Sequence, residues 1–249
     1  MQGLESAVGI DKVSKVFGEH TVLKDLTFDI PKNKITSILG FSGAGKSTLL
    51  KLILGLHHPS SGSVTVMGKK LQDLNDMELR EFRQNYGMLF QYAALFDSKS
   101  AFENVAFPLR EFTKMSEDEI HEKVDALLES VGIAKISFEK IPSELSGGMR
   151  KRVGLARALA LSPRIMLYDE PTTGLDPITT KMVNDLIVET AALHKERGLT
   201  SIIISHDVKA TLKISDFVAF LDRGRIVEYL PANEFANSSN PLVQEFINL

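Results

Sequence analysis

The sequence predicts an α/β fold with a mostly parallel sheet, and three apolar runs support this prediction. The first run, residues 35–39, leads into a Gly-rich stretch at residues 40–48 that is followed by a helical pattern, which is the order strand, loop, helix. Residues 165–168 and 202–204 are two further runs typical of buried strands, and each ends in polar residues. In an open α/β sheet the ligand lies at the carboxyl ends of the strands, so we expect the polar residues after the three runs to surround one site.

The Gly-rich stretch fits the pattern G-x-x-x-x-G-K-[ST] of a phosphate-binding loop. Glycines let the backbone curl so that N–H groups converge, and the following helix points its positive end at the same place. Lys46 adds a charge for the β- and γ-phosphates, and the Ser47 hydroxyl suits Mg²⁺. A plain Gly-rich turn is the alternative, but the flanking strand and helix disfavour it. The predicted nucleotide contacts are Gly40, Ser42, Gly43, Ala44, Gly45, Lys46, Ser47 and Thr48.

Composition bounds the possible functions. The 249 residues carry 29 basic and 32 acidic side chains, a net charge of −3, so the chain lacks the basic footprint of a nucleic-acid binder. It has no cysteine, which excludes disulfides and thiolate metal sites and fits a reducing cytosol. No apolar run approaches the length of a membrane span, and residues 1–10 do not read as a signal peptide. Work at a membrane would therefore require a partner.

The N-terminal part reads as short strands joined by turns. Residues 8–16 and 21–30 are strand-like, and residues 63–67 form another strand after Gly55 and the 59–62 cluster end the loop helix. Phe17 precedes the first turn. It is either an ordinary core phenylalanine or an aromatic face for an adenine ring.

The middle of the chain is mixed. Residues 71–84 look helical, and residues 86–90 form a strand that ends at Gln91. Residues 92–112 have no clean period of either kind. They contain four aromatics that belong either to the core or to an exposed docking groove; these are Phe96, Phe102, Phe107 and Phe112. A helix follows over residues 116–131, with a Ser116–Glu119 capping box and Gly132 at its end.

A second anion site is expected at residues 145–149. Ser146 is a plausible N-cap, and a Ser-Gly-Gly turn with free N–H groups at a helix N-terminus favours an anion. A plain capped helix start is the alternative. The helix carries the cations Arg150, Lys151, Arg152 and Arg157.

Polar residues with chemical potential follow the last two buried runs. Asp169 and Glu170 are adjacent carboxylates, whose burial Mg²⁺ would offset; Asp169 would hold the metal and Glu170 would orient the attacking water. His206 follows the next run at the same expected sheet edge. A helix begins at Pro177, with an apolar face predicted at Met182, Leu186 and Ile187, and residues 218–221 and 226–230 read as a hairpin.

Together these residues resemble the nucleotide-binding domain of ABC transporters, over about residues 8–230. Residues 40–48 resemble the Walker A loop and Leu145–Met149 the LSGG signature. Gln91 resembles the Q-loop glutamine, and Ile165–Glu170 resembles Walker B with its catalytic glutamate. Residues 174–176 resemble the D-loop, His206 the switch histidine, and Phe17 the adenine-stacking aromatic.

The resemblance implies a P-loop NTPase fold. Its RecA-like, mostly parallel sheet core would carry an N-terminal antiparallel β subdomain and an inserted α-helical signature subdomain at about residues 92–160. Residues 1–230 would form this single domain and residues 231–249 a short C-terminal tail.

The resemblance also implies a mechanism with ATP and Mg²⁺. Two copies would pair head to tail, so that Ser146, Gly147, Gly148 and Asp176 serve the nucleotide site of the partner copy. Lys46, Gln91, Glu170 and His206 would act in catalysis. Ser47, Gln91 and Asp169 would hold the metal. A membrane permease would dock on about Tyr92–Phe112.

One subfamily fits best, the ATPase of Mla-type phospholipid transporters with MCE-domain proteins. The resemblance lies in residues 89–98, 103–109, 147–152, 176–179 and 240–247. It implies a peripheral position on the cytoplasmic face of the inner membrane, held through the permease. Mla ATPases carry a further C-terminal extension, whereas this sequence stops at Leu249, so the contact with a small STAS-type subunit stays open.

Other readings remain. The same motor could serve a permease for amino acids or for lipoprotein release, since the permease chooses the substrate. A soluble ABC ATPase acting on DNA or ribosomes would need long heptads or a second cassette, and neither is present. A phosphate-loop kinase or GTPase would leave the LSGG turn unexplained, and the Asn-Lys-x-Asp guanine motif is missing.

Overall fold

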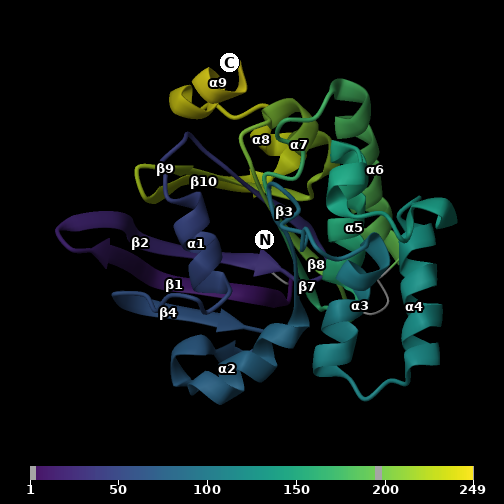
Figure 1. The fold of residues 1–249 in the computed structure, drawn as a ribbon. Coiled ribbons are helices and arrows are strands. Elements are labelled where there is room, and N and C mark those ends of the chain that lie inside the picture. The colour runs from purple at the N-terminus through teal and green to yellow at the C-terminus, as the bar shows by residue number, and fades with distance from the viewer. Residues whose placement is uncertain (1–3, 194–197, 249) are drawn as a thin grey trace. The chain divides into compact units, whose positions relative to one another are not determined.

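The computed structural model describes residues 4–193 and 198–248. The ends of the predicted domain and tail, residues 1–3 and 249, lie outside this range. The chain divides into a first unit, Met1–Arg83 with Leu193–Leu249, and a second unit, Gln84–Ala192. Figure 1 shows the elements of both, and each unit is described by itself.

An antiparallel sheet opens the first unit, in the order β2-β1-β4-β5. Its strands are β1 (Ser6–Phe17), β2 (His20–Pro31), β4 (Ser61–Val66) and β5 (Lys69–Lys70). Along β2 the inward positions Leu26, Phe28 and Ile30 are buried and alternate with exposed residues. This is the two-residue period of a sheet with one solvated face, and it confirms the predicted strands.

The second sheet of this unit places β3 (Ile35–Leu39) between β8 (Thr200–Ser205) and β9 (Phe217–Asp222). β3 is parallel to both neighbours. All residues of β3 and β8 are buried, as expected for strands covered on both faces. β10 (Arg225–Pro231) closes the predicted hairpin with β9 through a turn in which Arg223 and Gly224 have positive φ. The mostly parallel core and the N-terminal antiparallel sheet confirm the predicted fold class.

The first unit also contains five α-helices among its described residues. They are α1 (Lys46–Ile53), α2 (Asp76–Phe82), α7 (Val208–Ile214), α8 (Ala232–Phe235) and α9 (Pro241–Ile247). The continuous helix predicted over residues 71–84 is wrong. The short turn η1 (Leu71–Asp73) precedes α2, and η2 (Arg83–Asn85) follows it. Asn75 separates η1 from α2, because its side chain caps α2 in a capping box with Glu78.

The second unit pairs β6 (Tyr86–Leu89) with β7 (Ile165–Asp169) in parallel. Its helices are α3 (Ala101–Phe112), α4 (Glu117–Ser130), α5 (Gly147–Leu159) and α6 (Pro177–Leu193), with short turns η3 (Lys135–Ser137) and η4 (Pro142–Glu144). The predicted Ser116–Glu119 capping box and the N-cap at Ser146 are confirmed. None of the described helices is long and apolar enough to cross a bilayer.

Half of the segment predicted to be irregular, residues 92–112, is the helix α3. Its buried positions Phe102, Val105, Ala106 and Leu109 follow the spacing i, i+3, i+4, i+7 of one helix face. Counting aromatics alone conceals this stripe, because two of its members are Val and Ala. Phe102 therefore belongs to the core, whereas Phe96 and Phe112 are exposed.

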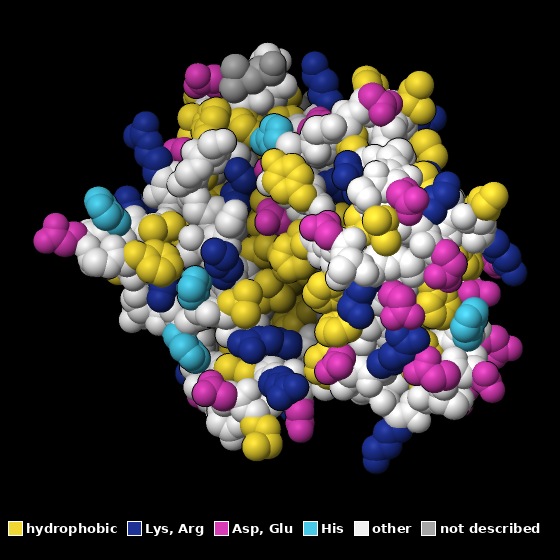
Figure 2. Space-filling view, viewed as in Figure 1, with side chains coloured by type: hydrophobic (Ala, Val, Ile, Leu, Met, Phe, Trp, Pro, Cys, Tyr) yellow, Lys and Arg dark blue, Asp and Glu magenta, His cyan; other side chains and the backbone are white. Residues whose placement is uncertain are grey.

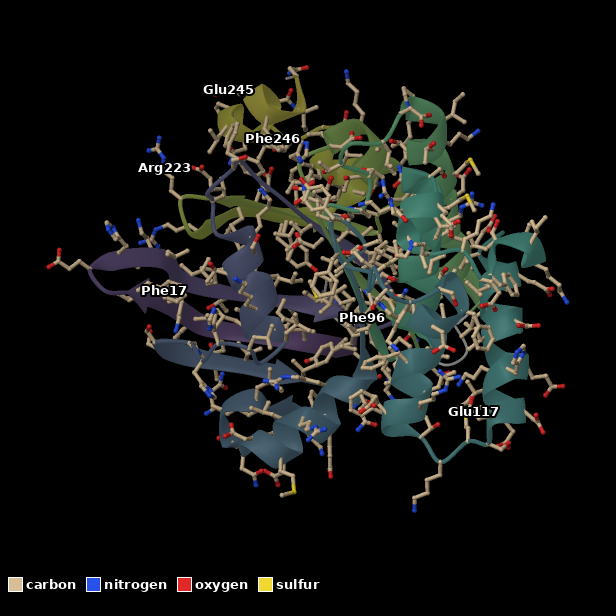
Figure 3. All side chains as sticks on the ribbon, in the orientation of Figure 1. Phe17, Phe96, Glu117, Arg223, Glu245 and Phe246 are labelled. Atoms are coloured by element: carbon tan, nitrogen blue, oxygen red, sulfur yellow. The ribbon has the colours of Figure 1, made fainter. Side chains whose placement is uncertain are left out.

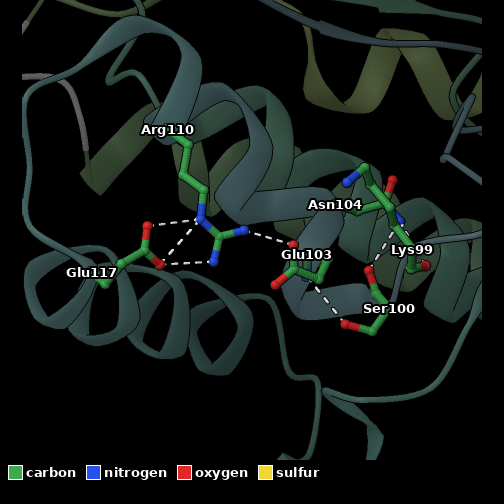
Figure 4. A network of polar contacts seen from close by, with 6 residues as sticks. All are labelled: Lys99, Ser100, Glu103, Asn104, Arg110 and Glu117. Carbon is green, nitrogen blue, oxygen red and sulfur yellow. Dashed lines mark hydrogen bonds and ion pairs between the residues drawn. The ribbon is translucent and has the colours of Figure 1, made fainter.

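Polar side chains fix both ends of α3 (Figure 4). Buried Asn104 accepts from the Phe96 N–H and donates to the carbonyls of Phe96, Lys99 and Ser100, which shapes the loop before the helix. Arg110 donates to Glu103 at 2.6 Å and to Glu117 of α4 at 2.8 Å. Hydrogen bonds with Glu117 and Glu103 raise the pKa of Arg110, which therefore stays protonated. The contact of Arg110 with Glu117 joins α3 to α4.

The apolar face predicted for α6 is partly wrong. Ile187 is buried as expected, but Met182 is exposed and the other buried positions are Val183 and Thr190. Val183, Ile187 and Thr190 follow the helical spacing i, i+4, i+7. Met182 lies one position before Val183, outside this buried face, and is therefore exposed to solvent.

The C-terminal tail completes the core of the first unit. Phe246 of α9 is buried against Phe220 of β9 at 4.8 Å between ring centroids, and against Phe41 of the Gly-rich loop at 5.0 Å. Its neighbour Glu245 is exposed (Figure 3). The tail is therefore attached to the loop at residues 40–48 by an aromatic cluster.

On the face drawn in Figure 2, acidic and basic side chains are interspersed.

We expect Phe246→Ala to lower the free energy of unfolding by about 3–5 kcal/mol, because it removes a buried ring and leaves a cavity. Glu245→Ala on the same helix is the control, with an expected change of less than about 0.5 kcal/mol. Urea unfolding followed by circular dichroism measures both. Equal stability of the two variants would show that α9 is only loosely attached.

Candidate functional site

The Gly-rich loop of the first unit is held close to the β9–β10 hairpin. A Cβ atom at Gly40 would lie 2.1 Å from the Leu221 carbonyl oxygen, so only glycine fits there. The Gly224 N–H donates to the Ala44 carbonyl at 3.1 Å. The hairpin therefore fixes the loop at two points.

Lys46 lies at the first position of α1, with its side chain buried in the loop. Its Nζ donates to the Gly40 carbonyl at 2.6 Å and to the Phe41 carbonyl at 3.0 Å. No side chain caps the N-terminus of α1. The first-turn N–H groups of any α-helix lack intrahelical partners, and beside an ammonium group they form an anion site.

Strand register brings His206 to this loop. Leu39, the last residue of β3, pairs with Ser205, the last residue of β8, so Gly40 and His206 follow at the same sheet edge. Both residues line a cleft of about 450 Å³, together with Phe41, Ser42 and Phe246. Asp207 caps α7 by accepting from the Ala210 N–H at 3.0 Å, which fixes the turn that carries His206.

Phe17 is not a core residue, because 42% of it is exposed. It lies at the last position of β1 (Figure 3). Its ring contacts His57 edge-on at 5.5 Å, and Lys15 Nζ lies 4.8 Å from its centroid. The interpretation of Phe17 as a core residue is therefore wrong. Its ring is exposed, as an aromatic face for an adenine ring would need to be.

In the second unit, the parallel pairing of β6 with β7 brings together the residues that follow these two strands. Leu89 pairs with Tyr168, so Gln91 and the carboxylates of Asp169 and Glu170 follow at one edge. Glu170 has φ of 49°, a strained value for a residue other than glycine and one that is typical of functional sites. The Thr173 hydroxyl donates to Glu170 Oε2 at 3.0 Å and orients this carboxylate.

The predicted signature turn and Asp176 lie side by side. A Cβ atom at Gly148 would lie 2.7 Å from Thr179 Cγ2, so the turn packs closely on the start of α6. Asp176 accepts from the Thr179 hydroxyl at 2.5 Å and from its N–H at 3.0 Å, and these bonds hold the pKa of Asp176 below its usual value. Gly147 and Gln91 both line a second cleft of about 650 Å³.

Lys151 also belongs to this region, although its sequence context predicts only a cation on a helix. It is 5% exposed and donates to the carbonyls of Gln91 and Glu170. Burial lowers the pKa of Lys151 to about 8, against the opposing effect of the nearby carboxylates. A signal was available, since Lys151 shares the i, i+4, i+8 stripe of α5 with Leu155 and Leu159, which are both buried.

The residues present fit Mg²⁺ as a cofactor. Ser47 lies in the first unit, and Gln91 and Asp169 lie in the second. Each of the three carries a side-chain oxygen, the type of donor that Mg²⁺ uses beside substrate phosphates. Among the described residues no cluster of three or more His, Cys, Asp and Glu side chains could hold a metal by itself.

Comparison with known proteins identifies the family. A family model described as ABC transporter matches residues 23–173. The chain is 40% identical over 242 residues to a protein of Mycobacterium leprae named probable ribonucleotide transport ATP-binding protein mkl, covering 97% of this chain and 69% of that protein. It is 40% identical over 245 residues to the methionine import ATP-binding protein MetN of Geobacillus kaustophilus, covering 96% and 70%.

Solved structures agree with these relatives. The ATP-binding cassette MJ0796, in a dimeric post-hydrolysis state with ADP and Pi, superposes with a TM-score of 0.81 at 31% identity, over 90% of this chain and 98% of that one. The cbiO1 protein of Clostridium perfringens, part of the ABC transporter complex cbiONQ, gives a TM-score of 0.85 at 29% identity, over 98% and 100%. The chain belongs to the ABC transporter family. It is the ATP-binding motor subunit of an ABC transporter, an ATPase that uses ATP and Mg²⁺.

Proposed function

We propose that this chain hydrolyses ATP with the residues that the strand ends gather. In this mechanism Lys46 and the loop N–H groups bind the β- and γ-phosphates, and Phe17 stacks on the adenine ring. Glu170 orients the attacking water, and His206 contacts the γ-phosphate from the same edge as Gly40. Mg²⁺, held by Ser47, Gln91 and Asp169, would neutralise charge on the phosphates.

The signature turn acts on a second copy of the chain in this proposal. Ser146, Gly147 and Gly148 offer N–H and hydroxyl donors at the start of α5, and Asp176 lies beside them. Donors at a helix N-terminus suit the γ-phosphate of the ATP bound by the partner copy. ATP would then favour the closed head-to-tail dimer, and hydrolysis would release it.

The permease would dock on residues 92–112. Tyr92 is 82% exposed and Phe96 is 40% exposed, an apolar presentation that suits a protein partner. The loop is preformed, because Asn104 fixes it from α3 and Arg157 of α5 donates to the carbonyls of Ala93 and Ala94. Docking would place the chain on the cytoplasmic face of the inner membrane.

For the cargo we propose phospholipid, moved by a Mla-type system with an MCE-domain protein and, in some assemblies, a small STAS-type subunit. The observation that carries this proposal is the resemblance of residues 89–98 and 103–109, which overlap the docking segment at residues 92–112, to Mla-type ATPases. The second candidate is amino-acid import, favoured by the 40% identity to MetN over 245 residues.

Gly40→Ala is expected to weaken ATP binding about tenfold or more, because the new Cβ atom displaces the loop from the Leu221 carbonyl. The control is Gly68→Ala. Gly68 also has positive φ, but a Cβ atom there meets nothing within 4 Å. Fluorescence titration with a nucleotide analogue measures both. Equal affinities would argue that the loop tolerates the displacement and that its geometry is not required.

Glu170→Gln is expected to leave ATP binding intact and to lower turnover at least about tenfold, since it removes only the group that orients water. Phosphate release under saturating ATP gives the turnover, and equilibrium binding gives the affinity. Turnover close to that of the wild type would show that Glu170 does not have this role.

The cargo is tested by purifying the tagged chain from its native membranes and identifying the attached proteins and lipids by mass spectrometry. We expect a permease, an MCE-domain protein and phospholipid. Phe96→Ala is expected to lose at least about 90% of the permease by removing the exposed ring from the docking segment. Met77→Ala, which removes a side chain that is 73% exposed on α2, is expected to retain it.

A permease recovered with a solute-binding protein and without an MCE-domain protein would replace the phospholipid assignment by amino-acid import. Full recovery of the permease with Phe96→Ala would place the docking surface elsewhere.

A further inference from the structure

We propose that Lys151 is a positioning residue for ATP hydrolysis, which fixes the backbone of Gln91 and Glu170 through their carbonyl oxygens. This inference rests on the proposed roles of Gln91 and Glu170. Lys151 itself has no proposed contact with ATP or metal.

The contacts are concentrated on one ammonium group. Lys151 is 5% exposed on α5, and its Nζ donates to the Gln91 carbonyl and, at 3.4 Å, to the Glu170 carbonyl. Gln91 lies after β6 and Glu170 after β7, so one side chain joins the ends of two adjacent strands. A shift of either loop would leave a buried ammonium short of an acceptor, which is costly.

Glu170 has a particular need for such a contact. Its φ of 49° is strained for a residue with a side chain and persists only where the surroundings impose it. Its carbonyl accepts from Lys151 and from the Thr173 N–H at 3.3 Å, while the Thr173 hydroxyl holds its carboxylate at 3.0 Å. Main chain and side chain are thus both fixed, which sets the direction of the carboxylate.

Stability does not require a lysine at this position. Lys151 lies on one stripe of α5 with Leu155 and Leu159, where an apolar side chain would be easier to bury. Arg157, farther along the same helix, donates to the carbonyls of Ala93 at 2.7 Å and Ala94 at 2.8 Å. The helix that begins at the signature turn therefore fixes the chain from Gln91 to Ala94 at two points.

The test compares Lys151→Met with Lys151→Arg and with the control Lys135→Met in the full-length protein, or in its complex with the permease. Lys135 belongs to the same unit, and its side chain is 72% exposed beside Glu129. We expect Lys151→Met to lower kcat about tenfold or more while the KM for ATP and the Kd for ATP stay within about threefold. Lys151→Arg keeps two donors and is expected to recover at least about half of kcat. Lys135→Met is expected to hydrolyse ATP as the wild type does.

The second measurement repeats Lys151→Met in the Glu170→Gln background. The loss of kcat in Lys151→Met is proposed to come mainly from a displaced Glu170 carboxylate. Where Gln replaces Glu170 that carboxylate is already absent, so the further loss of kcat is expected to be less than about twofold. If Lys151→Met does not fold, as judged by thermal unfolding, Lys151→Gln is measured in the same two backgrounds. Its amide NH₂ can still donate to a carbonyl but is neutral, so the charge-assisted contacts are lost in this variant as well.

Each outcome separates the inference from the proposed function. If Lys151→Met has the kcat of the wild type while the kcat of Glu170→Gln is lowered, the inference is wrong and the role of Glu170 stands. An equal fold loss in both backgrounds also overturns it, since the effect of Lys151 would then not depend on the Glu170 carboxylate. Wild-type kcat for Glu170→Gln overturns the proposed role of Glu170, and the inference falls with it.

Discussion

In each unit the candidate functional residues depend on in-register parallel pairing of buried strands. Leu39 pairs with Ser205 in one unit and Leu89 pairs with Tyr168 in the other, so the loops that follow each pair begin at the same edge. Residues more than a hundred positions apart in the sequence, such as Gly40 and His206, thereby line one cleft. A slip of one residue would turn every side chain to the opposite face. β3 and β8 are buried along their whole length, so a slipped register would have to be repacked on both faces of the sheet.

Both units use a buried ammonium group to fix the loops at these strand ends. Lys46 donates to two carbonyls of its own loop, Gly40 and Phe41, and Lys151 donates to two carbonyls from separate loops, Gln91 and Glu170. A charge-assisted bond to a carbonyl is stronger than a neutral one, and a buried cation needs several of them. The difference lies in what the contacts join. Lys46 shapes one loop around its own charge, whereas Lys151 joins two loops.

Sequence patterns predict those features whose cause is local. The phosphate-binding loop, the capping box at Ser116 and the β9–β10 hairpin each depend on residues within a few positions of one another, and all are present. Apolar spacing predicts one helix over residues 71–84, but this spacing does not register Asn75, whose side chain begins α2 as its N-cap. The spacing of the aromatics alone does not predict the helix α3, because Val105 and Ala106, which belong to its buried face, are not aromatic. Spacing places Lys151 on the buried stripe of α5, but it does not identify the carbonyls that Lys151 contacts or the rings that Phe246 contacts, since these partners lie far along the chain.

The comparisons indicate where substrate identity resides in such a motor. A relative named for ribonucleotide transport and one named for methionine import share the same 40% identity with this chain over almost its whole length. Identity of that extent reflects the shared ATP-handling machinery, which every permease needs in the same form. On the docking role proposed above, residues specific to one transporter are expected where the motor meets its permease. In this chain the preformed, apolar segment after Gln91 is the region to which that difference is best assigned, because it is exposed, fixed from α3 and α5, and directly continuous with a residue proposed to hold the metal.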